Sequence, residues 1–273
     1  MKDIVLFDMD GTLTKPRRSI SNRTIECLGM LNRHVDVGIV SGSPYDYINE
    51  QMSEAWSLPY GLDFTRLKIM PCNGTQLYEF IDNKFSKKHD VDIIGKLGKQ
   101  NYRYMISILT DLQNQIVESY EDMPFSGNFV SFRGSTVNWC MIGRDAGEDM
   151  RTEFIEMDKG FRKKYKRILD SELKRANITN VKTALGGSTS IDIYPAGWDK
   201  TYCLRHCQQY KNIYFVGDKC APGQNDFELY ESSRTKSFQT SGPDETESLM
   251  LRILGDLKAV SYTHLTLPTI CSV

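Results

Sequence analysis

Two aspartates near the start of the chain carry its clearest chemical signal. Asp8 and Asp10 follow residues 4–7, an apolar run with branched side chains that predicts a short strand buried on both faces. Ligands bind at the carboxyl ends of such strands in open α/β sheets. Two carboxylates this close repel each other unless a cation or a proton intervenes. Gly11 and Thr12 then let the chain turn and offer backbone N–H groups to an anion. We therefore expect a cation and an anion to meet here; an acidic turn without function is the alternative.

Residues 35–40, V-D-V-G-I-V, predict a second strand that ends in small residues. Ser41, Gly42 and Ser43 follow it and precede a predicted helix. Hydroxyl and backbone N–H groups in this arrangement bind phosphate. Ser41 and Ser43 are both candidates for the hydroxyl that contacts it.

The last third of the chain adds a lysine, an amide and two further carboxylates. Lys200 stands at the start of a predicted helix, and residues 212–216 predict a buried strand that leads to Asp218. A carboxylate at this strand end suits Mg²⁺, which prefers oxygen ligands. We expect Asn225 and Asp226, a few residues further on, to hold Lys200 or the water molecules around the metal.

Arginines are placed where they can bind a second phosphate group. Arg133 and Arg144 stand at the ends of predicted strands and Arg151 follows on a helix, so the three guanidinium groups can converge on one concave surface. Arginine suits bidentate recognition of phosphate. Arg17, in the loop after the two aspartates, is a further candidate. The alternative is that all of these are surface residues with buried stems.

The order of the predicted elements indicates two domains. Strands and helices alternate over residues 1–87 and again over 195–258, which predicts an α/β core with a doubly wound, Rossmann-like parallel sheet. Residues 88–194 predict the order helix-strand-strand twice, with one long helix over 147–174. An antiparallel sheet backed by two helices, an α+β cap inserted into the core, satisfies this order. Residues 259–273 fit neither pattern and predict a disordered or appended tail.

The last predicted strand of this cap carries two polar residues on one face. Ser190 and Asp192 are separated by Ile191, and alternate residues of a strand point the same way. Both side chains can therefore hydrogen-bond the hydroxyl groups of one sugar.

Composition excludes several other classes of protein. The chain has 273 residues and a formal net charge of −1, so no global field attracts nucleic acid or an acidic membrane. No apolar run approaches the length of a membrane span, and no secretory signal begins the chain. Seven scattered cysteines, an odd number, predict reduced thiols and a cytoplasmic protein. Cys203, His206 and Cys207 could share a helix face, but no second ligand pair stands at zinc spacing, which favours ordinary helix residues over a metal site.

The string Asp8-Met9-Asp10-Gly11-Thr12 resembles the first motif of the haloacid dehalogenase-like phosphotransferases. The resemblance implies that Asp8 is the nucleophile that becomes phosphorylated and that Asp10 is the general acid/base. It also implies a Mg²⁺ ion held by the side chain of Asp8, the backbone carbonyl of Asp10 and Asp218, and a lysine, here Lys200, that neutralises the phosphoaspartyl group. A carboxylate is a competent covalent nucleophile, and Mg²⁺ lets two anions approach each other.

Further strings are similar to the eukaryotic-type phosphomannomutases over about residues 3–257. They are the first ten residues from Asp8, Phe132-Arg133, Ile142-Gly143-Arg144 with Arg151, Ser190-Ile191-Asp192, Gly197-Trp198-Asp199-Lys200 and Gly217-Asp218-Lys219. The resemblance implies that Arg17, Arg133, Arg144, Arg151, Ser190 and Asp192 bind the sugar phosphate. The departures are local: Ser41 and Gln224 stand where these mutases usually have Gly. Ser232-Ser233 replaces an Asp-Pro pair near a second cation site at residues 230–235, so the sequence does not support that second cation.

These resemblances imply a mutase that interconverts mannose 6-phosphate and mannose 1-phosphate through a phosphoaspartyl enzyme and so feeds GDP-mannose synthesis. They imply Mg²⁺, a hexose 1,6-bisphosphate as activator, and a homodimer formed through the cap. Hexose phosphates are the expected partners; nucleic acid and membranes are not. Ser190 and Asp192 would contact hydroxyls common to several hexoses, so mannose is not distinguished from glucose. A Mg²⁺-dependent sugar-phosphate phosphatase of the same superfamily is the alternative, and a sugar-phosphate-binding protein without catalysis is a third possibility.

Overall fold

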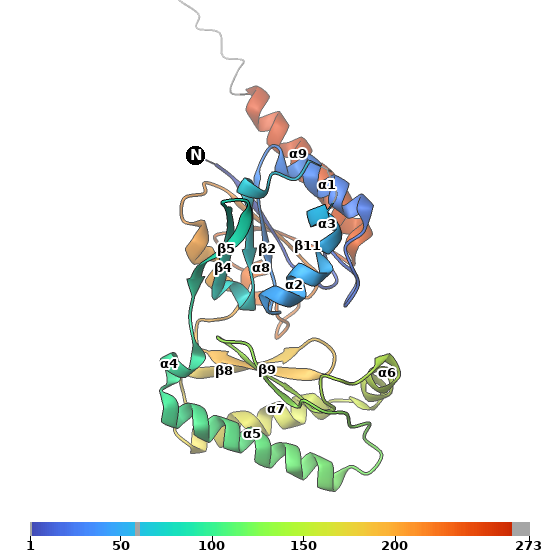
Figure 1. Ribbon diagram of the computed structural model, residues 1–273, viewed down its shortest axis with the longest axis vertical. Helices are drawn as coiled ribbons and strands as arrows, with labels where there is room; N and C mark the ends of the chain where they lie inside the picture. The colour runs from blue at the N-terminus through green and yellow to red at the C-terminus, as the bar shows by residue number, and fades with distance from the viewer. Residues whose placement is uncertain (1, 58–60, 264–273) are drawn as a thin grey trace, which may run out of the picture.

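A seven-stranded sheet organises the first and last parts of the chain in the computed structural model, which describes residues 2–57 and 61–263 (Figure 1). The strand order is β11-β10-β1-β2-β3-β4-β5; the first five strands are parallel and the last two form an antiparallel hairpin. The bounds are β1 (Ile4–Phe7), β2 (Asp36–Val40), β3 (Leu67–Met70), β4 (Gln76–Ile81), β5 (Lys84–Asp90), β10 (Ile213–Gly217) and β11 (Lys236–Gln239).

Both faces of this sheet are covered, which is why its central strands are apolar without interruption. On one face, Val5 and Phe7 pack in a cluster with helices α1 (Asn22–Asn32) and α9 (Pro243–Thr263). On the other, Ile4 and Leu6 pack against the 3₁₀ helix η3 (Lys200–Cys207) and helix α8 (Phe227–Tyr230). The remaining short elements are α2 (Tyr45–Gln51), α3 (Ser53–Ser57), η1 (Phe64–Arg66) and η2 (Cys72–Gly74). We call these elements, with the seven strands, the core.

The elements from α4 to β9 form a second unit, a sheet with helices packed on it, which we call the cap. Its sheet has the order β6-β7-β9-β8 and is antiparallel throughout. Helices α5 and α7 cover the face away from the core (Figure 1). The bounds are α4 (Ile93–Leu97), α5 (Lys99–Ser119), β6 (Val130–Phe132), β7 (Val137–Cys140), α6 (Glu148–Met157), α7 (Phe161–Arg175), β8 (Val181–Gly186) and β9 (Ser190–Pro195).

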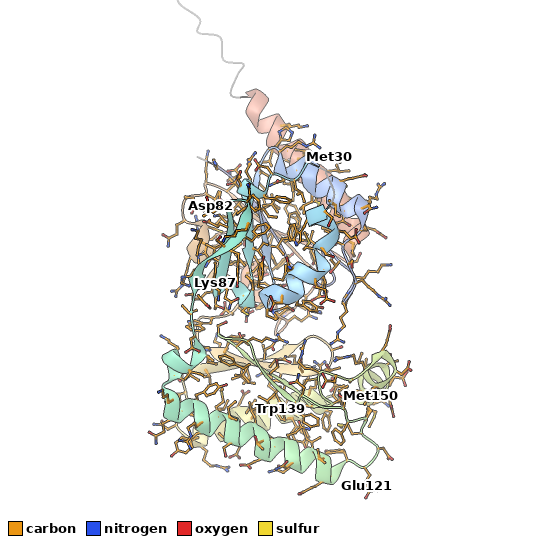
Figure 2. The ribbon with its side chains drawn as sticks, in the orientation of Figure 1. Met30, Asp82, Lys87, Glu121, Trp139 and Met150 are labelled. Atoms are coloured by element: carbon orange, nitrogen blue, oxygen red, sulfur yellow. The ribbon has the colours of Figure 1, made fainter. Side chains whose placement is uncertain are left out.

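Alternation along the cap strands decides which side chains reach the core. Trp139 of β7 is fully buried inside the cap (Figure 2), where its indole N–H donates a 2.7 Å hydrogen bond to Gln113 Oε1 of α5. Ile191 and Ile193 of β9 belong to the same apolar cluster. Their neighbours along the two strands therefore point to the opposite face, toward the core.

Two short connections join core and cap beside one another. Tyr194, Trp198 and Tyr202 form a buried group there, and Val91 and Ala184 pack against it. We call these five residues the junction cluster. The predicted domain boundaries at 87/88 and 194/195 fall within β5 and one residue before the end of β9, and the division into domains at those positions stays a prediction.

Three details differ from the sequence-based expectations. The single helix expected over 147–174 is two helices, α6 and α7, because Gly160 between them has a φ of +100°. The helix expected at Lys200 is of the 3₁₀ type. Helix α9 continues to Thr263, into the predicted tail, and residues 264–273 lie outside the described part of the chain.

Candidate active site

The site is built at the carboxyl end of β1, which lies between β10 and β2 in the middle of the parallel strands. Asp8 follows this strand and is almost fully buried. Its carboxylate Oδ1 accepts a 2.5 Å hydrogen bond from Lys200 Nζ, and the same ammonium donates to Asp226 Oδ1. Burial alone would lower the pKa of Lys200, but the carboxylates of Asp226 and Asp8 raise it above its ordinary value. A charged lysine is therefore fixed against Asp8; that it neutralises a phosphoaspartyl group stays a prediction.

Three carboxylates surround this point. Asp8, Asp218 and Asp226 each offer an oxygen, and these oxygens lie within 4.8 Å of one another. Burial, and then the charge of Asp8, raises the pKa of Asp218 to about 6. Asp218 Oδ1 and Asn225 Oδ1 are buried oxygens without a hydrogen-bond partner among the described residues. Buried acceptors are normally paired, and a cluster of hard oxygen ligands fits a divalent cation. The donor set here therefore fits such a cation.

The turn after β1 has glycine at position 11, where no side chain would fit. Its φ is +91°, and a Cβ there would lie 2.3 Å from Asp218 Oδ2. Only glycine lets the turn and the Asp218 carboxylate occupy adjoining space.

Asp10 is held by donors that sequence analysis did not identify. Its Oδ1 accepts hydrogen bonds from Tyr47 Oη at 2.9 Å, Gln51 Nε2 at 3.2 Å and the backbone N–H of Arg17 at 3.1 Å. Thr14 donates to Gln51 Oε1 at 2.8 Å, which fixes the orientation of that amide. Tyr47 and Gln51 are one helical turn apart on α2, the helix after Ser41-Gly42-Ser43, and their i, i+4 spacing is a signal that could have found them.

Across from the core, the cap presents a connected row of polar side chains. Arg133 Nη1 donates to the carbonyl of Gly42 at 3.1 Å and lies 3.9 Å from Asp192 Oδ1. Asn138 Nδ2 donates to the same Asp192 oxygen at 2.6 Å, and Arg144 Nη1 donates to Asn138 Oδ1 at 3.2 Å. Asn138 was also missed by sequence reasoning; its signal is its position one residue before the buried Trp139.

Arg151 is partly buried and donates three hydrogen bonds within the cap. It donates to the carbonyls of Ala146 and Arg144 and to Thr189 Oγ1, each at 2.9 Å, and so fixes the loop that carries Arg144. Burial, and then the charges of Arg133 and Arg17, lowers the pKa of Arg144. Several guanidinium groups thus face one region with too few carboxylates to pair them, an arrangement that attracts an anion.

One cavity of about 830 Å³ joins these parts between core and cap. Most of the predicted site residues line it: Asp8, Asp10, Arg17, Ser41, Gly42, Ser43, Arg133, Arg144, Arg151, Ser190, Asp192, Lys200 and Asn225. Asp218 and Asp226 do not line it but stand beside Asp8 in the acidic cluster. Ser190 Oγ donates to the carbonyl of Gly186 at 2.8 Å, and Ser41 Oγ accepts from the backbone N–H of Ser43 at 3.1 Å. The structure brings the predicted residues together, while their individual roles stay predictions.

Comparison with known proteins shows which protein family the chain belongs to. The family model of eukaryotic phosphomannomutase matches residues 24–256. The chain belongs to the eukaryotic phosphomannomutase family. A phosphomannomutase of Dendrobium officinale is 35% identical over 250 residues, which cover 89% of this chain and 90% of the relative. Phosphomannomutase 1 of Dictyostelium discoideum is 35% identical over 252 residues, 90% of this chain and 94% of the relative.

Solved structures confirm the fold that the phosphomannomutase resemblance predicts. An IMP-nucleotidase of Plasmodium falciparum superposes with a TM-score of 0.63 at 12% identity, covering 93% of this chain and 70% of that one. A trehalose-6-phosphate phosphatase related protein gives a TM-score of 0.53 at 17% identity, covering 93% and 99%. At these identities the likeness concerns the fold alone. Among the helices described, none has the length and apolar character that crossing a bilayer requires.

Proposed function

We propose that this protein is a phosphomannomutase that interconverts mannose 6-phosphate and mannose 1-phosphate through a phosphorylated Asp8. Family membership supports the activity. The observation that carries the mechanism is the buried Lys200–Asp8 pair facing the cap arginines across one cavity. A mutase has to hold both ends of a hexose bisphosphate, and this cavity has a phosphoryl-accepting carboxylate on one side and guanidinium groups on the other.

In the first half-reaction, a sugar hydroxyl oxygen attacks the phosphorus of phospho-Asp8. The bond from phosphorus to the aspartyl oxygen breaks, the carboxylate of Asp8 is restored, and the hydroxyl proton passes to Asp10. The bound hexose 1,6-bisphosphate then turns end for end. In the second half-reaction Asp8 attacks the other phosphoryl group, and Asp10 returns its proton to the leaving sugar oxygen. Lys200, held by Asp226, offsets the charge at Asp8 throughout.

Phosphorylation of Asp8 at the start requires a phosphoryl donor, for which we propose a hexose 1,6-bisphosphate. We propose Mg²⁺ as the divalent ion, held by the side chains of Asp8 and Asp218 and by the backbone carbonyl of Asp10. When bound, it neutralises negative charge between carboxylate and phosphoryl group. Asp218 Oδ1, which lacks a partner among the described residues, supports this assignment.

The remaining residues divide the substrate between them. We propose that Ser41, Gly42 and Ser43 bind the phosphoryl group in transfer, while Arg17, Arg133, Arg144 and Arg151 bind the other phosphate. Ser190 and Asp192 bind sugar hydroxyls. The cap that carries most of these groups also keeps water from phospho-Asp8.

³¹P NMR of the purified protein with Mg²⁺, mannose 1-phosphate and catalytic glucose 1,6-bisphosphate tests the proposal. We expect a mannose 6-phosphate signal to grow without inorganic phosphate. Inorganic phosphate alone would identify a sugar-phosphate phosphatase instead. Asp8→Asn abolishes turnover if the phosphoaspartyl route holds; retained turnover would refute it.

We further propose a homodimer formed through the cap and a cytoplasmic location. Three large apolar residues of the cap, Tyr104, Phe132 and Ile155, are each 51% exposed. Six cysteines in the described residues are buried free thiols, which suits a reducing compartment. Light scattering of the purified protein tests the dimer: a mass of one chain at micromolar concentration would exclude it.

A further inference from the structure

Strand β9 carries a third cavity-lining residue beyond Ser190 and Asp192. Tyr194 is next in the alternating row, and all three line the cavity between core and cap. Its ring belongs to the junction cluster, and only 6% of the residue is exposed. Tyr194 is therefore a buried residue at the end of the cavity nearest the two connections between core and cap.

The hydroxyl of Tyr194 differs from the other polar groups of its strand. Ser190 Oγ donates to Gly186 O, and Asp192 Oδ1 accepts from Asn138. Tyr202, beside Tyr194 in the junction cluster, pairs its hydroxyl with His89 Nε2 at 3.0 Å. Among the described residues no group is hydrogen-bonded to the Tyr194 hydroxyl. Its oxygen is also not one of the buried unpaired oxygens of the described residues. The hydroxyl is therefore open to the cavity that Tyr194 lines and is available to a ligand there.

The surroundings keep this hydroxyl a donor. Burial raises the pKa of Tyr194, and the nearby carboxylates of Glu228, Asp199 and Asp192 raise it further. The phenol is thus protonated at neutral pH. A neutral O–H among carboxylates suits a polyol rather than a phosphate, whereas the guanidinium groups of the same cavity suit phosphate.

We propose that Tyr194 determines specificity for the sugar by donating a hydrogen bond to a ring hydroxyl of the bound hexose phosphate. The assignment rests on the proposed function, because it takes the ligand of this cavity to be a hexose phosphate. It adds a contact to the sugar itself that is separate from the phosphate-binding arginines. Tyr194 touches the sugar in this proposal but no reacting atom, so the loss of its hydroxyl weakens recognition without abolishing chemistry.

The test compares Tyr194→Phe with a matched control, Tyr202→Phe. Both variants remove one hydroxyl from the junction cluster, but only Tyr194 lines the cavity. Each protein is assayed on mannose 1-phosphate and on analogues that lack the hydroxyl at C2, C3 or C4. Thermal unfolding of the ligand-free proteins is measured in parallel.

We expect Tyr194→Phe to lower kcat/KM on mannose 1-phosphate about 10-fold, the typical effect of one lost hydrogen bond to an uncharged partner. On the one analogue that lacks the contacted hydroxyl, the variant and the wild type should agree within about twofold. The Tm of ligand-free Tyr194→Phe should stay within about 2 °C of the wild type, because the hydroxyl has no partner in the described residues to lose. Tyr202→Phe should lower the Tm and leave the discrimination among analogues unchanged.

The possible failures are distinguishable. If the wild type turns over none of the sugar phosphates, the proposed function fails. If the wild type is active but Tyr194→Phe loses the same factor on every analogue, or nothing on mannose 1-phosphate, the specificity role of Tyr194 is refuted. A fall in Tm for Tyr194→Phe would assign its hydroxyl a structural partner and refute the proposal as well.

Discussion

At the scale of single residues, hydrogen bonds fix the orientation of the Asp10 carboxylate. Three donors converge on its Oδ1, and two of them belong to α2. A general acid/base works only within hydrogen-bond reach of the proton it moves. The hydrogen bonds from Tyr47 and Gln51 therefore act on the orientation of Asp10 and, in the mechanism that we propose, through it on the chemical step.

Tyr47→Phe removes one of these donors without changing the ring. We expect kcat to fall about 10-fold, in line with one hydrogen bond, while KM for the sugar phosphate stays within about twofold. Steady-state kinetics with mannose 1-phosphate measures both. Tyr45→Phe is the matched control. The ring of Tyr45 stacks on that of Tyr78, with 3.9 Å between the ring centroids, and Tyr45 does not contact Asp10. A rise in KM at constant kcat would contradict the assignment.

His206 makes the stability of the core depend on pH. Burial lowers the pKa of this histidine, whose Nε2 lies 2.8 Å from the carbonyl oxygen of Gly74. Below pH of about 6.5, the unfolded chain then binds a proton that the folded chain does not, so the free energy of unfolding falls as the pH falls.

Urea unfolding between pH 7.5 and 5.5 checks this expectation. His206→Gln keeps an N–H donor but does not titrate, so its unfolding free energy should fall less over this interval than that of the wild type. Equal slopes for the two proteins would show that His206 does not contribute.

At the scale of elements, the sequence predicts well the strands that lead into candidate site residues. Residues 4–7, 35–40 and 212–216 are mostly apolar. Each is followed by residues that the structure gathers at the carboxyl ends of the parallel strands. Their pattern is local, so a single sequence contains it. The doubly wound core and the inserted antiparallel cap follow from the order of such runs.

The local patterns of a single sequence do not reveal which elements contact each other or in which register. Asn138 meets Asp192 because β7 and β9 pair in a register that places these two residues opposite each other, and no local pattern states that register. The break between α6 and α7 depends on one glycine with a positive φ, Gly160, inside a region whose apolar spacing continues on both sides. Tyr47 likewise gains its meaning only when α2 packs beside the turn after β1.

The turn after β1 gives a prediction at this scale. Gly11→Ala introduces a Cβ 2.3 Å from Asp218 Oδ2, so the carboxylate has to move. We expect Mg²⁺ affinity, measured by isothermal titration calorimetry, to fall about 10- to 100-fold, as it does when the groups that orient a metal ligand are disturbed.

Gly98→Ala is the control for Gly11→Ala. Gly98 has a φ of +80°, but a Cβ there meets nothing within 4 Å. Its substitution should cost stability through backbone strain alone and leave Mg²⁺ affinity unchanged. If both variants weaken Mg²⁺ binding equally, the displaced Asp218 is not the cause.

At the scale of the whole molecule, the cavity exists only while cap and core are together. Arg133 crosses between them to the carbonyl of Gly42 at 3.1 Å, and its side chain is only 8% exposed. A second crossing pair, Arg18 and Glu148, is 3.9 Å apart with side chains 71% and 86% exposed. Exposed pairs of this kind contribute little. The buried hydroxyls of Thr75 in the core and Ser135 in the cap also hydrogen-bond each other, so we assign the closed arrangement to this pair together with Arg133.

Arg133→Ala should therefore have two effects on turnover. KM for the sugar phosphate rises about 10-fold or more, because a charge-assisted contact is lost. The share of phospho-Asp8 that is lost to water also rises, seen as inorganic phosphate by ³¹P NMR. Arg18→Ala, the matched control, should leave both within about twofold of wild type. An unchanged KM in Arg133→Ala would remove Arg133 from the binding site.

The insertion of the cap between two halves of the core has a consequence for the order in which the protein is completed on the ribosome. Asp8 and Lys200 are 192 residues apart in the chain, and β1 is flanked by β10, which is synthesised late. The cap, from α4 to β9, is contiguous and emerges whole before β10 does. Domains fold as units during synthesis, so the cap, which we propose selects the sugar, is complete before the core that carries the proposed nucleophile. A nascent chain thus cannot form the Lys200–Asp8 pair before both the cap and Lys200 have been made.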